Sequence, residues 1–185
     1  MKPINNYENV QASSGDFSKL PAGAYVCKIT LADDVPMDEK TGKGDYLKIE
    51  FDIASGEYKD YFEKQYERFA SFWGGSFIRS YKEKALGMFK HFTNCVEQSN
   101  KGYMWAWDEK TLMGKYVGLV IGYEEYENSM GDIKERLIVT GIKTIEQIEK
   151  GDYKVPELKK LNRAPATPTP AFQASADLDE ELPFW

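Results

Sequence analysis

The last nine residues combine acidic and aromatic side chains in a pattern suited to binding another protein. Residues 177–185 hold four acids and no base, and they end in an apolar Leu-Pro-Phe-Trp sequence. So short a run has too little apolar surface to fold alone. It can instead place carboxylates on a basic rim and an aromatic ring in a pocket. The predicted partner-binding residues are Asp177, Asp179, Glu180, Glu181, Leu182, Pro183, Phe184 and Trp185.

Aromatic and basic side chains are interleaved in several other segments. These are the two kinds of group that bind single-stranded nucleic acid, because cations contact the phosphates and aromatic faces stack on bases at about 1–3 kcal/mol each. The alternative is that the aromatic residues form the core and the lysines only keep the surface soluble. The candidate DNA contacts are Lys40, Lys43, Tyr46, Lys48, Tyr61, Phe62, Lys64, Tyr66, Arg68, Tyr123, Lys134 and Arg136.

Residue types that support catalysis or bind metals are sparse. His91 is the only histidine, and Cys27 and Cys95 lack the spacing of metal ligands, so we predict two buried free thiols. The Glu-Tyr-Lys triplet at 57–59 has no Pro-Asp before it, and Gly-Lys-Gly at 42–44 is too short for a phosphate-binding loop. We therefore expect a protein that is not an enzyme and needs no metal and no cofactor.

Charge is unevenly distributed over the 185 residues. The formal net charge is −6, and four of the 30 acids lie in residues 177–185, which leaves 26 acids against 24 bases in the rest of the chain. Any nucleic-acid site in this nearly neutral body must be a local groove. The N-terminus has no apolar signal region, and no stretch is long enough to span a bilayer, so we expect a cytoplasmic protein in a reducing environment.

Alternating apolar residues predict the first strands. Residues 25–31 alternate, and residues 46–53 alternate most clearly, with Leu47, Ile49, Phe51 and Ile53 inward and Asp52 outward. A third strand is predicted over residues 57–66 after a Ser-Gly turn. Its aromatic residues also recur at spacings of three and four, which fits a helix, but the turn and the aromatic content favour a strand.

The period then changes to that of a helix. Residues 80–83 have the form of a capping box, and the apolar spacing that follows predicts a helix ending near Asn100. A helical turn is predicted at 108–112, strands at 116–126 and 133–142, and a short closing helix at 144–150. Five strands with a helix between the third and fourth is the order of the OB-fold, a five-stranded Greek-key barrel. We therefore predict a mainly β protein with one main helix.

The composition divides the chain into four parts. Residues 1–20 are predicted to be a flexible N-terminal arm, 21–156 the OB-fold domain, 157–176 a linker rich in Pro, Ala and Thr, and 177–185 the acidic tip at the end of a disordered tail. The linker gives the tip a reach of about 25 Å. In an OB-fold, the face of the second and third strands and the neighbouring loops bind oligonucleotides, which is where the candidate DNA contacts lie.

The tip resembles the acidic C-terminal tip of bacterial and phage single-stranded DNA-binding proteins, which reads Asp-Phe-Asp-Asp-Asp-Ile-Pro-Phe. Here Trp185 follows the terminal Pro-Phe pair. The body is similar to phage proteins with OB domains of this kind, and residues 61–66, 80–84, 89–90, 108–115 and 124–126 carry the likeness. The alternative for the tip is an acidic tail that only contacts solvent.

This resemblance implies a function and partners. A bacteriophage protein of this family would bind single-stranded DNA without strong sequence preference during DNA replication or recombination, and its tip would recruit replication and recombination proteins. Because tight binding needs several OB domains on one strand, a homo-oligomer is plausible. The alternative is an OB-fold adaptor that binds only other proteins. Intrinsic fluorescence of the four tryptophans during an oligo-dT titration would separate the two hypotheses.

Overall fold

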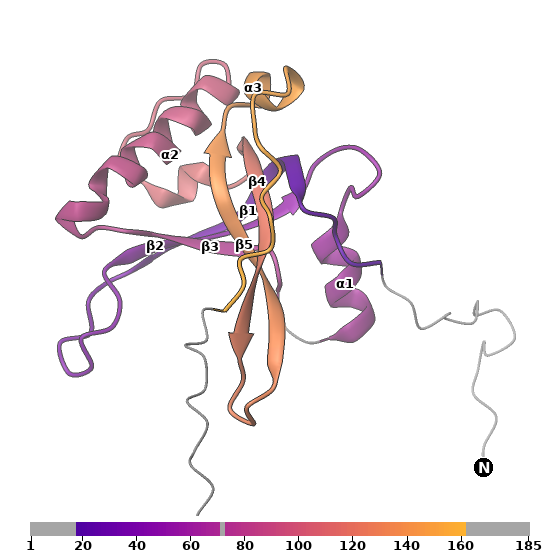
Figure 1. Cartoon of the computed structure of the whole chain (residues 1–185). Coiled ribbons are helices and arrows are strands. Elements are labelled where there is room, and N and C mark those ends of the chain that lie inside the picture. Colours follow the sequence, from indigo (N-terminus) through magenta and orange to yellow (C-terminus); the bar gives the residue numbers. More distant parts are fainter. Residues whose placement is uncertain (1–17, 71–72, 162–185) are drawn as a thin grey trace, which may run out of the picture.

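The computed structural model describes residues 18–70 and 73–161 (Figure 1). These residues are mainly β structure, with five antiparallel strands in the order β3-β2-β1-β4-β5. The strands are β1 (Gly23–Val35), β2 (Tyr46–Ile53), β3 (Ser76–Ser80), β4 (Tyr116–Glu127) and β5 (Ile133–Lys143). Within the described residues no pairing joins β3 to β5, so the sheet is open and the predicted closed barrel is not formed. The predicted disordered tail with its tip lies outside the described residues, as does most of the predicted arm.

The helices are α1 (Tyr61–Phe69), α2 (Leu86–Ser99) and α3 (Ile145–Glu149), with short 3-10 turns η2 (Glu83–Ala85) and η3 (Glu109–Leu112). The main helix between the third and fourth strands, the turn near 108–112 and the closing helix are therefore confirmed. No helix among these described elements is long and apolar enough to cross a membrane. In Figure 1, α1 and α2 lie on opposite sides of the strands.

The capping box predicted at residues 80–83 is not formed. The Ser80 hydroxyl accepts a hydrogen bond from the backbone N–H of Lys82, only two residues on, and α2 begins later, at Leu86. A capping box does form at α3, where the Thr144 hydroxyl accepts from the Gln147 N–H and the Gln147 side chain accepts from the Thr144 N–H. The chain therefore contains a capping box, but it lies at α3 and not at the start of α2, where it was predicted.

The strand predicted over residues 57–66 is wrong, because this region turns into α1. The cause lies on β2, where the Asp52 carboxylate accepts hydrogen bonds from the backbone N–H groups of Phe62 and Glu63, both at 2.9 Å. N–H groups of a first helical turn have no partner within the helix, so a carboxylate placed there stabilises the helix start. Asp52 is consequently 7% exposed rather than on the solvent side. Besides β1, the strand that pairs with β2 is β3, at residues 76–80, where no strand was predicted.

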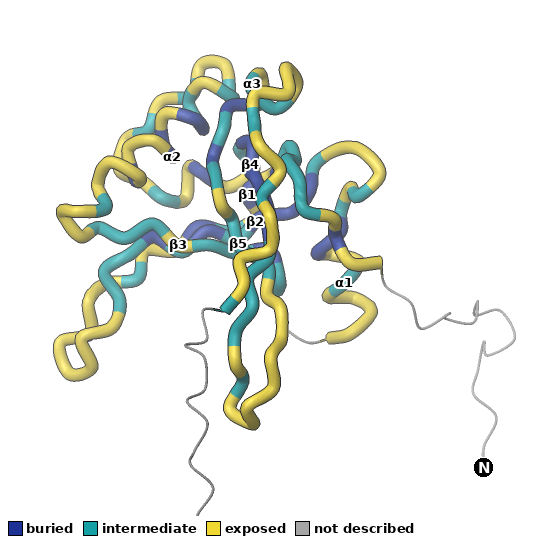
Figure 2. Tube along the Cα trace, viewed as in Figure 1, coloured by how far each residue is buried: buried dark blue, intermediate teal, exposed yellow. Residues whose placement is uncertain are grey.

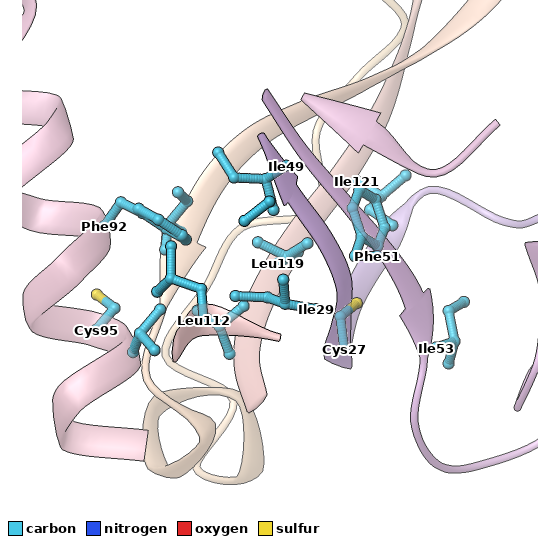
Figure 3. Packing of buried hydrophobic residues seen from close by; sticks show 14 of the residues in the cluster. Cys27, Ile29, Ile49, Phe51, Ile53, Phe92, Cys95, Leu112, Leu119 and Ile121 are labelled. Carbon is cyan, nitrogen blue, oxygen red and sulfur yellow. The ribbon is translucent and has the colours of Figure 1, made fainter. Parts of the chain in front are cut away.

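The core lies between the sheet and α2. Figure 3 shows Phe92 and Cys95 of α2 facing apolar residues of the sheet, among them Ile49 and Leu119. Buried positions concentrate where the strands cross, whereas the tips of the β1–β2 and β4–β5 loops are exposed (Figure 2). The predicted buried free thiols, Cys27 and Cys95, are confirmed.

Both ends of the described body are held to the sheet. Leu20, at the end of the predicted arm, is fully buried, and its N–H donates to the Tyr61 hydroxyl while its carbonyl accepts from the Tyr123 hydroxyl. Residues 157–161, at the start of the predicted linker, run beside β4. The Lys159 N–H donates to the Tyr123 carbonyl, and the Lys159 carbonyl accepts from the Glu125 N–H. This contact uses the part of β4 that extends past its pairing with β1, which ends at Ile121.

Candidate nucleic-acid interface

A groove of about 800 Å³ lies between α1, the start of β3 and the β4–β5 hairpin. It is found where the sheet stays open, since residues next to both unpaired edges, at β3 and β5, line it. Its walls combine aromatic, charged and small side chains. The lining residues are Lys19, Tyr61, Phe62, Gln65, Phe69, Trp73, Gly74, Ser76, Tyr123, Tyr126, Glu135, Arg136 and Leu137.

Aromatic rings with exposed surface form the α1 side of this groove. Phe69 lines the groove and is 50% exposed, and Tyr66, on the same helix but outside the groove lining, is 49% exposed. Trp73 is fixed beside them, because its indole N–H donates to the carbonyls of Phe51 and Gly75, both at 3.1 Å, and its ring lies 6.3 Å from that of Tyr66. These rings offer planar surfaces of the kind on which nucleobases stack.

Two of the predicted contacts form the floor of the groove instead. Phe62 is 2% exposed and packs edge-on against Phe51, with ring centroids 5.4 Å apart. The Tyr61 hydroxyl accepts from the Leu20 N–H and donates to the Ser18 carbonyl, both at 3.1 Å. These side chains present little ring surface to a ligand, so their role in the groove is to support its exposed rings.

The cations of the groove lie on aromatic faces. The Lys19 ammonium is 3.8 Å from the centre of the Tyr123 ring, and it forms an ion pair with Glu135. The Arg136 guanidinium is 5.5 Å from the centre of the Tyr126 ring. These aromatic contacts restrict where each positive charge can lie, and a phosphate in the groove would find both charges already placed.

Arg136 also has a carboxylate partner, Glu124. Its Nε donates to Glu124 at 2.7 Å, and the Lys159 ammonium approaches the other oxygen of the same carboxylate at 3.2 Å. Hydrogen bonds from Arg136 and then Lys159 lower the pKa of Glu124 below its ordinary value of 4.5. Glu124 is therefore ionised at neutral pH, and a phosphate would compete with it for Arg136.

The structure brings together part of the predicted contact set. Tyr61, Phe62, Tyr123 and Arg136 line the groove. Lys64, Tyr66 and Arg68 lie on α1, and Lys134 lies on β5. A second group lies on the β1–β2 loop and on β2, outside the groove lining: Lys40, Lys43, Tyr46 and Lys48. Lys48 in this second group forms an ion pair with Glu50 at 2.6 Å.

Nine of the thirteen lining residues were not predicted from the sequence, and those among them that could contact a nucleic acid directly are Lys19, Phe69, Trp73 and Tyr126. Trp73 carried a usable signal, because two glycines follow it. A Cβ on Gly75 would lie 2.4 Å from the Phe51 carbonyl oxygen and 2.6 Å from the Phe62 ring, so the chain must pass very close to the core here. Lys19 gave no such signal, because its place depends on the burial of Leu20.

No known protein-family model matches the chain, and no curated protein sequence matches it. In the part of the chain that the structure describes, no three His, Cys, Asp or Glu side chains are grouped as metal ligands would be.

Proposed function

We propose that this chain is an OB-fold protein that binds single-stranded DNA in the groove between α1 and the β4–β5 hairpin. The observation that carries the proposal is the combination of exposed aromatic rings on one wall with Lys19 and Arg136 on the other. In this proposal the protein acts in phage DNA replication or recombination and recruits partner proteins through residues 177–185.

The strand arrangement supports the OB-fold part of the proposal. β1 pairs with both β2 and β4, and the main helix α2 follows β3, as in a five-stranded Greek-key barrel. OB-folds are often partly open between their edge strands. Here the opening coincides with the groove, and α1 is an insertion between β2 and β3 that forms one of its walls.

The chemistry of binding follows from the two walls. Phosphates would exchange with the carboxylates of Glu135 and Glu124 at Lys19 and Arg136, while bases stack on Phe69, Trp73 and Tyr126. Because every base has an aromatic face, such binding has little sequence preference. A longer strand would continue toward the cations of the second group, on the β1–β2 loop and β2.

Fluorescence anisotropy of labelled oligo-dT with the full chain tests this proposal. We expect affinity to fall with salt at a slope near −0.7 per phosphate contact, and Arg136→Gln to reduce the slope by about one contact. Phe69→Ala, which removes an exposed ring of the groove lining, should lose about 1–3 kcal/mol of binding free energy. Lys150→Gln is the matched control, because Lys150 follows α3 and pairs only with Glu146 among the described ion pairs.

A protein-binding adaptor is the second candidate, and one observation favours it: both groove cations already have carboxylate partners. The same titration decides between the two. If micromolar protein gives no anisotropy change with oligo-dT at low salt, the DNA-binding proposal fails and the adaptor is favoured. If Arg136→Gln and Lys150→Gln bind alike, the DNA site is not in this groove.

A further inference from the structure

A second pocket, of about 260 Å³, shares no lining residue with the groove. Leu47 of β2 lies at its base, and its walls are the aromatic rings of Tyr81, Phe89, Trp105 and Trp107. Four aromatic side chains from α2 and from the segments on either side of it thus converge on one small space. This pocket has no part in the function proposed above.

The aromatic rings of this pocket are packed together, and one is unusually exposed. The Phe89 and Trp107 rings are nearly parallel, at 15°, with centroids 6.3 Å apart, and the Phe89 and Trp105 centroids are 6.2 Å apart. Trp107 is nevertheless 83% exposed. An exposed aromatic ring that is grouped with other aromatic rings, rather than standing alone, is typical of a binding surface.

Two carboxylates, Asp34 and Glu109, complete the lining of the pocket. Asp34 accepts a hydrogen bond from the Tyr81 hydroxyl at 2.9 Å. No ion pair among residues 18–70 and 73–161 involves Asp34 or Glu109. The pocket therefore carries negative charge without a cation of its own to balance it.

Negative charge beside aromatic faces selects one class of ligand. The face of an aromatic ring attracts cations, and the effect is strongest for tryptophan. The two carboxylates attract the same cation and repel a phosphate, so nucleic acid is disfavoured here. A guanidinium or ammonium group satisfies both features of the pocket.

The surroundings favour a protein as the source of that cation. Asp34 and Glu109 also line an adjoining hollow of about 570 Å³ that includes Pro36 and Met113. Its lining adds Asp33 and Lys110, so three acids there face one base. Met104, close to both tryptophans in the chain, is 80% exposed. Exposed Met and Trp next to a shallow surface are typical of protein interfaces, in which Arg is also enriched on the partner.

We propose that this pocket binds an arginine or lysine side chain of a partner protein, with Trp105 and Trp107 contacting the cation and Glu109 and Asp34 balancing its charge. The inference stands whether or not the chain binds DNA, because it rests on different residues.

Indole NMR signals of the full chain test the proposal, since the four tryptophans report separately on the pocket (Trp105, Trp107), the groove (Trp73) and the tip (Trp185). The signals would be assigned by single Trp→Phe variants. The probe is acetyl-Gly-Arg-Arg-Gly-amide, and the control peptide has Gln in place of both Arg residues. We expect saturable shifts of the Trp105 and Trp107 signals with the Arg peptide, an unshifted Trp73 signal, and no saturation with the Gln peptide.

Variants sharpen this test. Glu109→Gln should weaken the Arg peptide about fivefold, as expected for one favourable charge contact of about 1 kcal/mol. No hydrogen bond of the Glu109 side chain is found among the described residues, so this variant should fold normally, and an unchanged Trp73 signal checks that it does. Glu149→Gln, on α3, is the matched control and should bind like the parent chain.

Several outcomes would overturn the proposal. These are pocket signals that do not move with the Arg peptide, equal shifts with both peptides, or equal affinity of Glu109→Gln and Glu149→Gln. Saturable shifts of Trp105 and Trp107 with oligo-dT would reassign the pocket to nucleic acid. Tetramethylammonium binding as tightly as the Arg peptide would reassign it to a free small cation.

Discussion

Cys27 and Cys95 are held in the core, and their environment determines how they react. Burial raises the pKa of both thiols, and the nearby charge of Asp52 raises that of Cys27 further. The thiolate is the reactive form, so both effects suppress reaction with disulfides and alkylating agents. The cysteines are therefore packing residues, as their positions in apolar patterns predict.

We expect neither thiol to react with Ellman's reagent at pH 8 in the native chain, and both to react in denaturing urea. Absorbance of the released thionitrobenzoate measures this directly. Rapid release of one equivalent before urea is added would mean that one of the two sites is open to solvent, in conflict with the packing around it.

The Asp52 carboxylate stabilises the start of α1. It accepts hydrogen bonds from three backbone N–H groups, those of Ile53, Phe62 and Glu63. Asp52→Ala should cost about 1–2 kcal/mol for the lost helix cap, and more where a buried N–H is left without a partner. Urea denaturation measures the loss.

A matched control for Asp52→Ala lies at the start of the same helix. Asp60 directly precedes α1 but makes no side-chain capping bond, and its positive φ of 58° is one that asparagine tolerates. Asp60→Asn should therefore be nearly neutral. Equal losses in the two variants would show that charge near the helix, and not the hydrogen bonds of Asp52, stabilises α1.

At the scale of elements, α1 is the segment whose secondary structure the local sequence pattern could not decide. The aromatic residues of 57–69 fit a strand and a helix almost equally. The group that decides between the two is the carboxylate of Asp52 on β2, ten residues before Phe62. The long strands could be predicted because their alternation is local. The groove could be predicted only in part. One of its walls exists because residues 61–69 form α1 instead of a strand, and the position of Lys19 depends on where Leu20 is buried.

Residues 157–161 are held to β4 by main-chain hydrogen bonds at Lys159, and a proline substitution can test that contact. Lys159→Pro removes the N–H that donates to the Tyr123 carbonyl and also the exposed ammonium that pairs with Glu124, and should cost about 1 kcal/mol, mostly from the main-chain hydrogen bond. Hydrogen exchange is the sharper measurement, because the Glu125 amide, which donates to the Lys159 carbonyl, should lose protection.

Lys160→Pro is the control for this contact. The Lys160 N–H has no main-chain partner among the described residues. Proline at 160 favours an extended backbone at residue 159, which already forms a parallel bridge with Glu124. Protection of the Glu125 amide should therefore persist in Lys160→Pro. Its loss in both variants would mean that a proline in this segment displaces it from β4 whether or not the Lys159 N–H is present.

At the scale of the whole molecule, the open sheet follows from the unequal lengths of its edge strands. β3 has five residues and β5 has eleven, so β3 could cover only part of β5 even if the two met. The connection from β2 to β3 contains α1, which lies beside the opening and lines the groove. The four long strands and the place of α2 follow from local periodicity. The short strand β3 was not predicted, and closure of the sheet depends on strand lengths and on the insertion of α1, which local periodicity does not reveal.

The distribution of charge along the chain leads to the last prediction. The described segment ends beside β4, where the Leu161 N–H donates to the Glu125 carboxylate at 3.0 Å, and β4 forms one wall of the groove. The four acids of the tip therefore begin 16 residues beyond a point near the groove cations. Carboxylates and phosphates compete for the same cations, so deletion of residues 177–185 should leave oligo-dT affinity equal or higher, while binding of partner proteins is lost.

A charge-neutral tip separates competition from simple removal of the chain end. A full-length variant with Asn or Gln at all four acids should match the deletion in DNA affinity, because only charge is lost. The difference from the parent chain should shrink as salt is raised from 0.05 to 0.5 M, since the Debye length falls from about 14 Å to about 4 Å over this range. A marked loss of DNA affinity on deletion would mean instead that the tip contributes to DNA binding, because removing negative charge alone cannot weaken attraction to a polyanion.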